Sequence, residues 1–339
     1  MLHPRRPTSG PPLSRRALLT RVIPAGMVAL ASGCNTGMAA GAADPGAASG
    51  GTLGPPALLS YADLAGRLST AAFDFRMLVG APPSTAAWAS AAAAMCHAQA
   101  AVLGRSDPLT GTPVPPDAGS TPSGSTAGTV PTATPSAATA GALTRVAADQ
   151  AGIESAMRDR CLAAPSGDLA LLFASLGVAA HAVSHPSVPV VATGTVPFHC
   201  HVGDRSAALV VLLSRVDALV EGLDQGLGAL PFHDPAYTPG LTRLSEVETL
   251  RDTIQQDLLA ASVTPTPGPL DYALPGTTDS PAHVQTLWGM LERDVMAAWL
   301  RVAAASIGAD RGAAFDAAVS QQDLVAGHGV GISWWPGWV

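Results

Sequence analysis

Residues 209–227, LVVLLSRVDALVEGLDQGL, carry an apolar side chain at every third or fourth position. The side chains that define this stripe are Leu209, Leu212, Val216, Leu219, Leu223 and Leu227. Such spacing gathers apolar side chains on one face of an α-helix, and that face must be buried against other helices. The segment therefore predicts an amphipathic helix that is stable only inside a helical bundle.

The same periodicity recurs along the chain, and stretches rich in proline and glycine separate the helical segments. The other predicted helices cover roughly residues 61–78, 88–102, 146–161, 169–183, 244–258, 284–302 and 315–326. We expect an all-α fold of two antiparallel four-helix bundles, over residues 58–185 and 205–339, joined by Pro/Gly-rich loops. Residues 104–143 contain seven prolines and little charge, which predicts a disordered loop inside the first bundle.

Residues 14–34, SRRALLTRVIPAGMVALASGC, have the order of an export signal: basic residues, an apolar run and small residues before a cysteine. Arg15 and Arg16 resemble the twin-arginine export motif, and the residues ending at Cys34 resemble a bacterial lipobox. We expect a signal peptide over residues 1–33 that the twin-arginine translocase reads, and we expect lipidation of Cys34. The mature protein would then be held at the outer face of the cytoplasmic membrane by acyl chains, with residues 34–57 as a flexible tether.

The charge of the chain argues against nucleic acid as a partner. The net charge is −7 at pH 7, and all 18 basic residues are arginines. Removing residues 1–33 takes away five arginines and no acidic residue, which leaves 13 basic against 25 acidic residues and a net charge of −12. Binding to nucleic acid depends largely on the neutralisation of phosphates by basic side chains, which such a chain lacks.

The chain ends in the sequence WWPGW, residues 334–338. Three indoles in so short a segment predict a tail that packs over the helices, because each indole has a large apolar surface. A tip that touches the membrane is the alternative.

Residues 250–339 resemble a ferritin-like domain of unknown function found in exported lipoproteins of high-GC Gram-positive bacteria, and part of the amino-terminal half resembles the partner segment of the same lipoproteins, so that the resemblance covers most of the mature chain. The residues that carry the resemblance include Arg251-Asp252, Leu258-Leu259-Ala260-Ala261, Asp271-Tyr272-Ala273-Leu274-Pro275, Leu291-Glu292, Arg311 and Trp335-Pro336-Gly337 in the carboxyl-terminal half. In the amino-terminal half they are Cys161-Leu162-Ala163-Ala164, Asp168-Leu169-Ala170, Ala174-Ser175 and Ala180-His181-Ala182. The resemblance implies that the bundles are ferritin-like, and it implies no activity.

A ferritin-like bundle raises the possibility of a di-iron site, which needs buried carboxylates and Glu-x-x-His motifs. No Glu-x-x-His occurs in the chain. Asp217, Glu221 and Asp224 share one face of a helix at i, i+4 and i+7, and no histidine lies mid-helix beside them. We therefore interpret these three acids as a solvated face, and a degenerate di-iron enzyme as the least favoured alternative.

Cysteine and histidine supply the remaining candidate chemistry. Cys96 and Cys161 lie near the ends of two predicted helices of one bundle, so they could form a disulfide across the loop at 104–143. His199, Cys200 and His201 are ligand types that suit copper or zinc, as are Cys96 and His97, although their spacing matches no standard metal motif. A metal site at His199, Cys200 and His201 is one prediction, and ordinary surface or core roles are the other.

No nucleophile elbow, phosphate-binding loop or dinucleotide motif occurs in the sequence. We expect a membrane-anchored lipoprotein of the cell envelope that binds or supports other molecules and is not an enzyme. No cofactor is predicted, with copper or zinc as the alternative. The sequence does not identify a protein partner.

Overall fold

The computed structural model describes residues 58–111 and 137–338, apart from 187, 193–195, 266–267 and 270–271. The chain divides into two compact units, Met1–Gly54 and Pro55–Val339. The first unit lies outside the described residues, and so do Arg15, Arg16, Cys34 and the predicted tether. The predictions made for the signal peptide and its lipidation therefore fall on residues that are not described.

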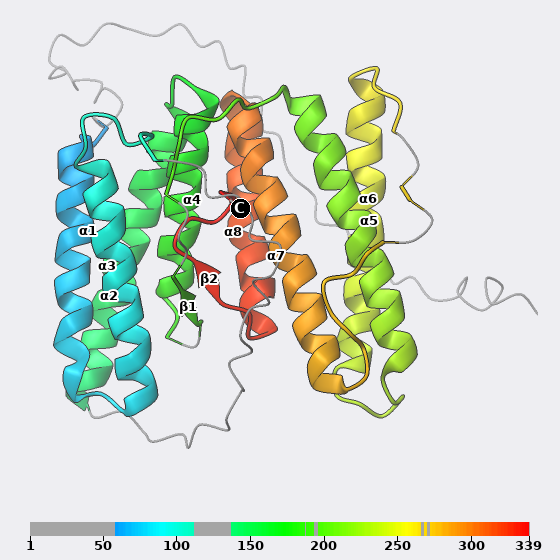
Figure 1. Cartoon of the computed structure of the whole chain (residues 1–339), viewed down its shortest axis with the longest axis horizontal. Coiled ribbons are helices and arrows are strands. Elements are labelled where there is room, and N and C mark those ends of the chain that lie inside the picture. Colours follow the sequence, from blue (N-terminus) through cyan, green and yellow to red (C-terminus); the bar gives the residue numbers. More distant parts are fainter. Residues whose placement is uncertain are drawn as a thin grey trace, which may run out of the picture. The chain divides into compact units, whose positions relative to one another are not determined.

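The described part of the chain is almost entirely helical, so the prediction of an all-α protein is confirmed (Figure 1). The helices are α1 (Tyr61–Arg76), η2 (Met77–Gly80, a 3₁₀-helix), α2 (Pro83–Leu103), α3 (Ala137–Leu162), α4 (Gly167–Val183), α5 (Arg205–Ala229), α6 (Tyr237–Ala260), α7 (Pro281–Ala305) and α8 (Gly308–Gly327). Two short strands, β1 (Val190–Val191) and β2 (Ile332–Ser333), pair in parallel.

Side-chain caps fix the start of several helices. The Ser60 hydroxyl accepts a hydrogen bond from the Asp63 backbone amide, and the Asp63 carboxylate accepts one from the Ser60 amide, which together form a capping box at α1. At α5 the Asp204 carboxylate accepts a hydrogen bond from the Ala207 amide, at 2.8 Å. These caps satisfy amide groups that the first turn of a helix leaves without partners.

Two hydrophobic cores lie within the unit Pro55–Val339. Helices α1 to α4 surround the first core, whose largest buried side chains include Phe75, Met95 and Phe173. Helices α5, α6 and α7 surround the second, where Leu219, Val247 and Trp288 are buried. In Figure 1 α1, α2 and α3 lie on one side of α4, and α5 and α6 lie beside α7.

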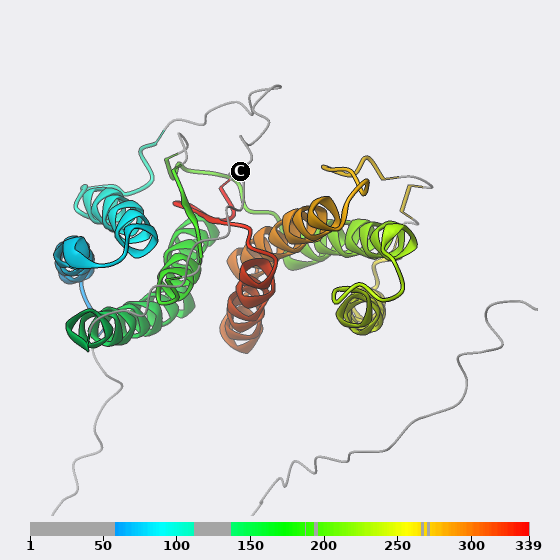
Figure 2. The same cartoon turned by 90° about the horizontal axis from the view of Figure 1, so that it is seen from below.

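Helix α7 takes part in both cores. Its residues Val284, Leu291 and Val295 are buried in the second core, whereas Met296 and Leu300 are buried in the first. Both α7 and α8 pack against α4, as the view along the helices shows (Figure 2). The two predicted groups of helices therefore share α7, and the two four-helix bundles stay a prediction.

The carboxyl-terminal tail packs over the helices, as predicted. Trp335 and Trp338 are buried in the first core, and the Gln99 amide on α2 donates a hydrogen bond to the Trp334 carbonyl at 3.0 Å. The pairing of β2 with β1 holds the segment before these indoles against the loop that follows α4.

The predicted disordered loop at 104–143 is too long at both ends. Leu109 is buried in the first core, and Thr110 forms an isolated antiparallel bridge with Phe198. At the other end, residues 137–143 belong to α3. Four of these seven residues are alanine, and the high helix propensity of alanine lets them extend the helix where periodicity alone gave no signal.

Helix α2 is the one described helix long and apolar enough to cross a membrane. About half of its most apolar stretch, 56%, is buried inside the protein. Because Trp88, Met95 and Val102 lie in the first core, we interpret α2 as a core helix.

Two glycines of α5 provide a matched test of the packing between α5 and α7. At Gly226 an added Cβ would lie 2.5 Å from Nε1 of Trp288, whereas at Gly228 it would meet nothing within 4 Å. We expect Gly226→Ala to lower the free energy of unfolding by about 1–3 kcal/mol through overpacking. Gly228→Ala should raise it by about 0.5–1 kcal/mol, since alanine loses less conformational entropy in a helix. Urea unfolding followed by circular dichroism measures both, and equal effects at the two positions would contradict this packing.

Candidate functional site

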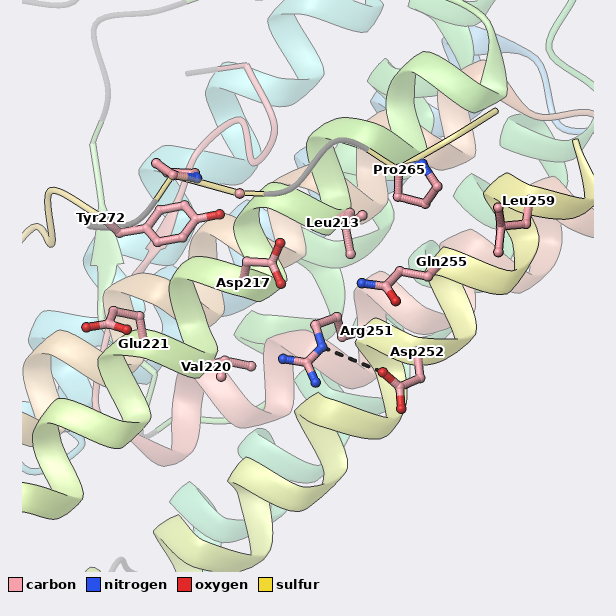
Figure 3. A pocket seen from close by; sticks show the side chains of 12 residues that line it. Leu213, Asp217, Val220, Glu221, Arg251, Asp252, Gln255, Leu259, Pro265 and Tyr272 are labelled. Carbon is pink, nitrogen blue, oxygen red and sulfur yellow. Dashed lines mark ion pairs between the residues drawn. The ribbon is translucent and has the colours of Figure 1, made fainter. Parts of the chain in front are cut away.

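An open cavity of about 670 Å³ lies between α5 and α6 (Figure 3). Its polar lining consists of Asp217 and Glu221 from α5, Arg251, Asp252 and Gln255 from α6, and Tyr272 from the loop before α7. This volume lies within the range of about 300–1,000 Å³ usual for small-molecule sites.

Asp217 lies at the centre of the cavity. Figure 3 shows its carboxylate directed into the space between the helices, with Gln255 and Arg251 on the opposite side. Burial raises the pKa of Asp217, and the nearby Arg251 guanidinium partly offsets the rise. Arg251 is itself shared with its neighbour Asp252, whose Oδ1 lies 3.6 Å from Nε. The carboxylate of Asp217 is thus partly desolvated and incompletely neutralised.

Tyr272 lies over this carboxylate, with its hydroxyl toward Asp217 (Figure 3). The hydroxyl is buried, and no described residue reaches it at normal hydrogen-bonding geometry. Burial raises the pKa of Tyr272, the charge of Asp217 adds to the rise, and the nearby Ser214 hydroxyl opposes it. A buried hydroxyl without a partner costs free energy that a ligand atom could recover.

The rest of the cavity lining is apolar. Leu213 and Val220 from α5, Leu259 from α6 and prolines of the loop before α7 contribute it. Sites that bind small organic molecules likewise combine apolar side chains with convergent polar groups.

The interpretation of Asp217, Glu221 and Asp224 as one solvated face was only partly right. Asp224 is exposed, but Asp217 and Glu221 are only partly exposed and line the cavity. The helical spacing of the three acids was visible in the sequence. The cavity was not, because α6 and Tyr272 come from other parts of the chain.

The predicted disulfide between Cys96 and Cys161 is not formed, and both are buried free thiols in the first core. Burial raises the pKa of each thiol to about 12. Thiols held protonated in this way behave as small apolar side chains and are unreactive. His97 is exposed whereas Cys96 is buried, so the two do not present a common site.

His199, Cys200 and His201 are not brought together as metal ligands. The His199 ring lies between two carboxylates, with Nε2 2.8 Å from Asp107 and Nδ1 2.9 Å from Asp168. Both ring nitrogens are therefore engaged, while Cys200 is partly buried and His201 is exposed. Across the residues that the structure describes, no group of three or more His, Cys, Asp or Glu side chains has the arrangement of a metal site.

The most deeply buried carboxylate of the second core is neutralised by an arginine. Glu292 on α7 has no exposed surface, and the Arg243 guanidinium on α6 donates to both of its oxygens, at 2.8 and 3.0 Å. The Gln321 side-chain amide on α8 also donates to it. Sequence reasoning missed this pair because Arg243 lies at an ordinary position of an amphipathic helix.

The comparisons with known proteins add no relationship: no family model matches the chain, and neither the curated proteins nor the solved structures contain a significant match.

Proposed function

We propose that this chain is an exported, lipid-anchored protein of the cell envelope that binds a small ligand in the cavity between α5 and α6 and does not act as an enzyme. The observation that supports binding is the cavity itself, where the partly desolvated Asp217 carboxylate faces the Tyr272 hydroxyl, for which no described residue completes a hydrogen bond of normal geometry. Such groups recover free energy when a complementary ligand pairs with them.

The proposal of export and anchoring rests on the sequence. Arg15-Arg16 and Cys34 are spaced as in twin-arginine-exported lipoproteins. In this proposal the helical body is a pair of ferritin-like bundles, held at the outer face of the cytoplasmic membrane by acyl chains on Cys34.

Anchoring is tested in a high-GC Gram-positive bacterium that expresses the full chain. We expect Cys34→Ala to abolish the incorporation of labelled palmitate and to move the protein out of the membrane fraction, and we expect Arg15→Lys with Arg16→Lys to retain it inside the cell. Cys200→Ala is the matched control, since it removes a thiol from the folded body and should leave both properties unchanged. Palmitate incorporation into the Cys34→Ala protein would contradict the proposal.

Ligand binding is tested with residues 55–339, which form a compact unit by themselves. Saturation-transfer NMR against a library of cationic, anionic and neutral small molecules should identify binders. Leu259→Trp should abolish their binding because the indole would obstruct the cavity. Leu259 is 59% exposed, so this change should leave the core intact. An absence of binders, or binders that Leu259→Trp leaves unaffected, would contradict the binding proposal.

A further inference from the structure

The ligand chemistry can be narrowed further, on the assumption that the proposed binding function is correct. Asp217 and Glu221 line the cavity, and the exposed Asp224 lies about one turn further along α5. We call this stretch of α5, together with the cavity beside it, the groove. In an α-helix these i, i+4 and i+7 positions share one face, and their backbones are separated by about 6 Å and about 4.5 Å along the axis. Carboxylates therefore follow one another along about 10 Å of the groove.

The two ends of this groove differ in charge. At the Asp217 end Arg251 supplies one positive charge, which it shares with Asp252. At the Asp224 end, burial raises the pKa of Asp224, and the neighbouring charges that raise it further are the carboxylates of Glu248 and Glu221. Glu221 accepts a hydrogen bond from the neutral Gln225 amide, which leaves its charge uncompensated. The groove as a whole carries excess negative charge.

Apolar side chains alternate with these acids. Leu213 and Val220 lie on α5 on either side of Asp217, and Leu259 faces them from α6. Tyr272 adds an aromatic ring, and its buried hydroxyl oxygen, for which no described residue completes a hydrogen bond of normal geometry, can accept one from a ligand. An ammonium group between Asp217 and Tyr272 would have an acceptor on each side, and the methylenes that follow it would contact the apolar walls.

We propose that the cavity binds a linear aliphatic polyamine, a chain of ammonium groups separated by three or four methylenes. With C–C and C–N bonds near 1.5 Å, such ammonium groups lie about 5–6 Å apart, which matches the spacing of the acids along α5. One terminal ammonium pairs with Asp217 and Tyr272, and the next pairs with Glu221 and Asp224. A single divalent cation fits less well, since no described group of acids has the arrangement of a metal site.

Isothermal titration of residues 55–339 with spermidine tests this proposal. We expect saturable binding that weakens as salt is raised, because the pairs are partly exposed. Butylamine, which has one ammonium, should bind at least about tenfold more weakly, because it lacks the second charge-assisted hydrogen bond. Equal affinities for the two amines would overturn the proposal of a polyamine.

Matched variants locate the site. Asp217→Asn should weaken spermidine binding by about 10–100-fold, the loss expected for one partly buried charge-assisted hydrogen bond. Asp224→Asn changes an exposed residue, cannot disturb the core, and should weaken binding severalfold. Asp74→Asn on α1 makes the same change of charge far from the groove and is the control. An equal loss in all three variants would show non-specific attraction to an acidic protein and would overturn the proposal.

The two proposals fail in different ways. If spermidine does not bind but other small molecules do, and Leu259→Trp abolishes their binding, the polyamine proposal is wrong and the binding function stands. If no compound in the library binds, both are wrong.

Discussion

Arg243→Ala is expected to lower the free energy of unfolding by about 3–5 kcal/mol, because it leaves a buried carboxylate without a charge partner. Glu292 has no exposed surface, and both of its oxygens accept hydrogen bonds from Arg243. The Gln321 amide would remain as a neutral donor and cannot replace the lost charge. Urea unfolding of residues 55–339, followed by circular dichroism, measures the loss.

Two further variants distinguish the loss of the charge pair from a general effect of removing an arginine. Arg243→Met combined with Glu292→Met replaces the pair with apolar side chains of similar length, and we expect it to recover most of the loss, as buried ion pairs commonly allow. Arg145→Ala removes an exposed arginine of α3 and should change the free energy of unfolding by less than about 0.5 kcal/mol. A loss below about 1 kcal/mol for Arg243→Ala would show that Glu292 is not held as an ion in the core.

Apolar periodicity was sufficient to predict the helices. The stripe from Leu209 to Leu227 falls on the face of α5 that is buried in the second core, and the other stripes likewise lie on buried faces. Periodicity predicts these helices because each helix must bury one face, and the residues that form this face are spaced three or four apart within the helix itself.

The grouping of the helices could not be predicted in the same way. The sequence suggested one stripe for α7, running from Val284 to Val302, whereas Met296, Leu300 and Ala304 form a second buried face directed at the first core. A helix with two apolar faces must lie between two partners, but the pattern does not say which partners these are. Pairing between segments far apart in the chain, such as β1 with β2, leaves no local signal either.

The residues of the candidate site could be recognised in the sequence, but their convergence could not. The acids of α5 have a helical spacing that can be recognised directly, and Arg251 and Tyr272 belong to the segments that carry the family resemblance. Their convergence depends on the packing of α6 and of the following loop against α5. Cys96, Cys161 and His199 were candidates because thiols and imidazoles bind metals. The structure gives them structural roles, because both thiols are buried and His199 pairs with two carboxylates.

His181 joins three helices through two carboxylates, and sequence reasoning gave it no role. Its ring on α4 lies with Nδ1 3.0 Å from Glu154 on α3 and with Nε2 2.9 Å from Asp323 on α8. The hydrogen bond with Glu154 is the largest cause that raises the pKa of His181. Burial opposes the rise, and the hydrogen bond with Asp323 adds to it. The pKa of His181 is therefore about 9, against 6.5 for an unperturbed histidine. His185, whose ring centre lies 5.7 Å away, is a neighbouring titratable group just after the end of α4.

A histidine whose pKa is higher in the folded than in the unfolded state stabilises the folded state while it is protonated. The contribution of His181 should be fully present below about pH 6.5, the pKa of the unfolded state, and should disappear as the pH rises through about 9, its folded-state pKa. We expect this contribution to be about 2–3 kcal/mol, since each unit of pKa shift corresponds to about 1.4 kcal/mol and the site is partly open to solvent.

The measurement is the difference in the free energy of unfolding between the wild-type protein and His181→Gln at several pH values from 6 to 10. We expect wild type to be the more stable at pH 6, and we expect the difference to shrink steadily and vanish above about pH 9, because deprotonated His181 has no charge to offer Glu154 and Asp323. His97→Gln, which changes an exposed histidine of α2, should show no such trend. A difference that stays constant from pH 6 to 10 would mean that His181 connects α3, α4 and α8 through neutral hydrogen bonds and packing, without the charge that the two carboxylates indicate.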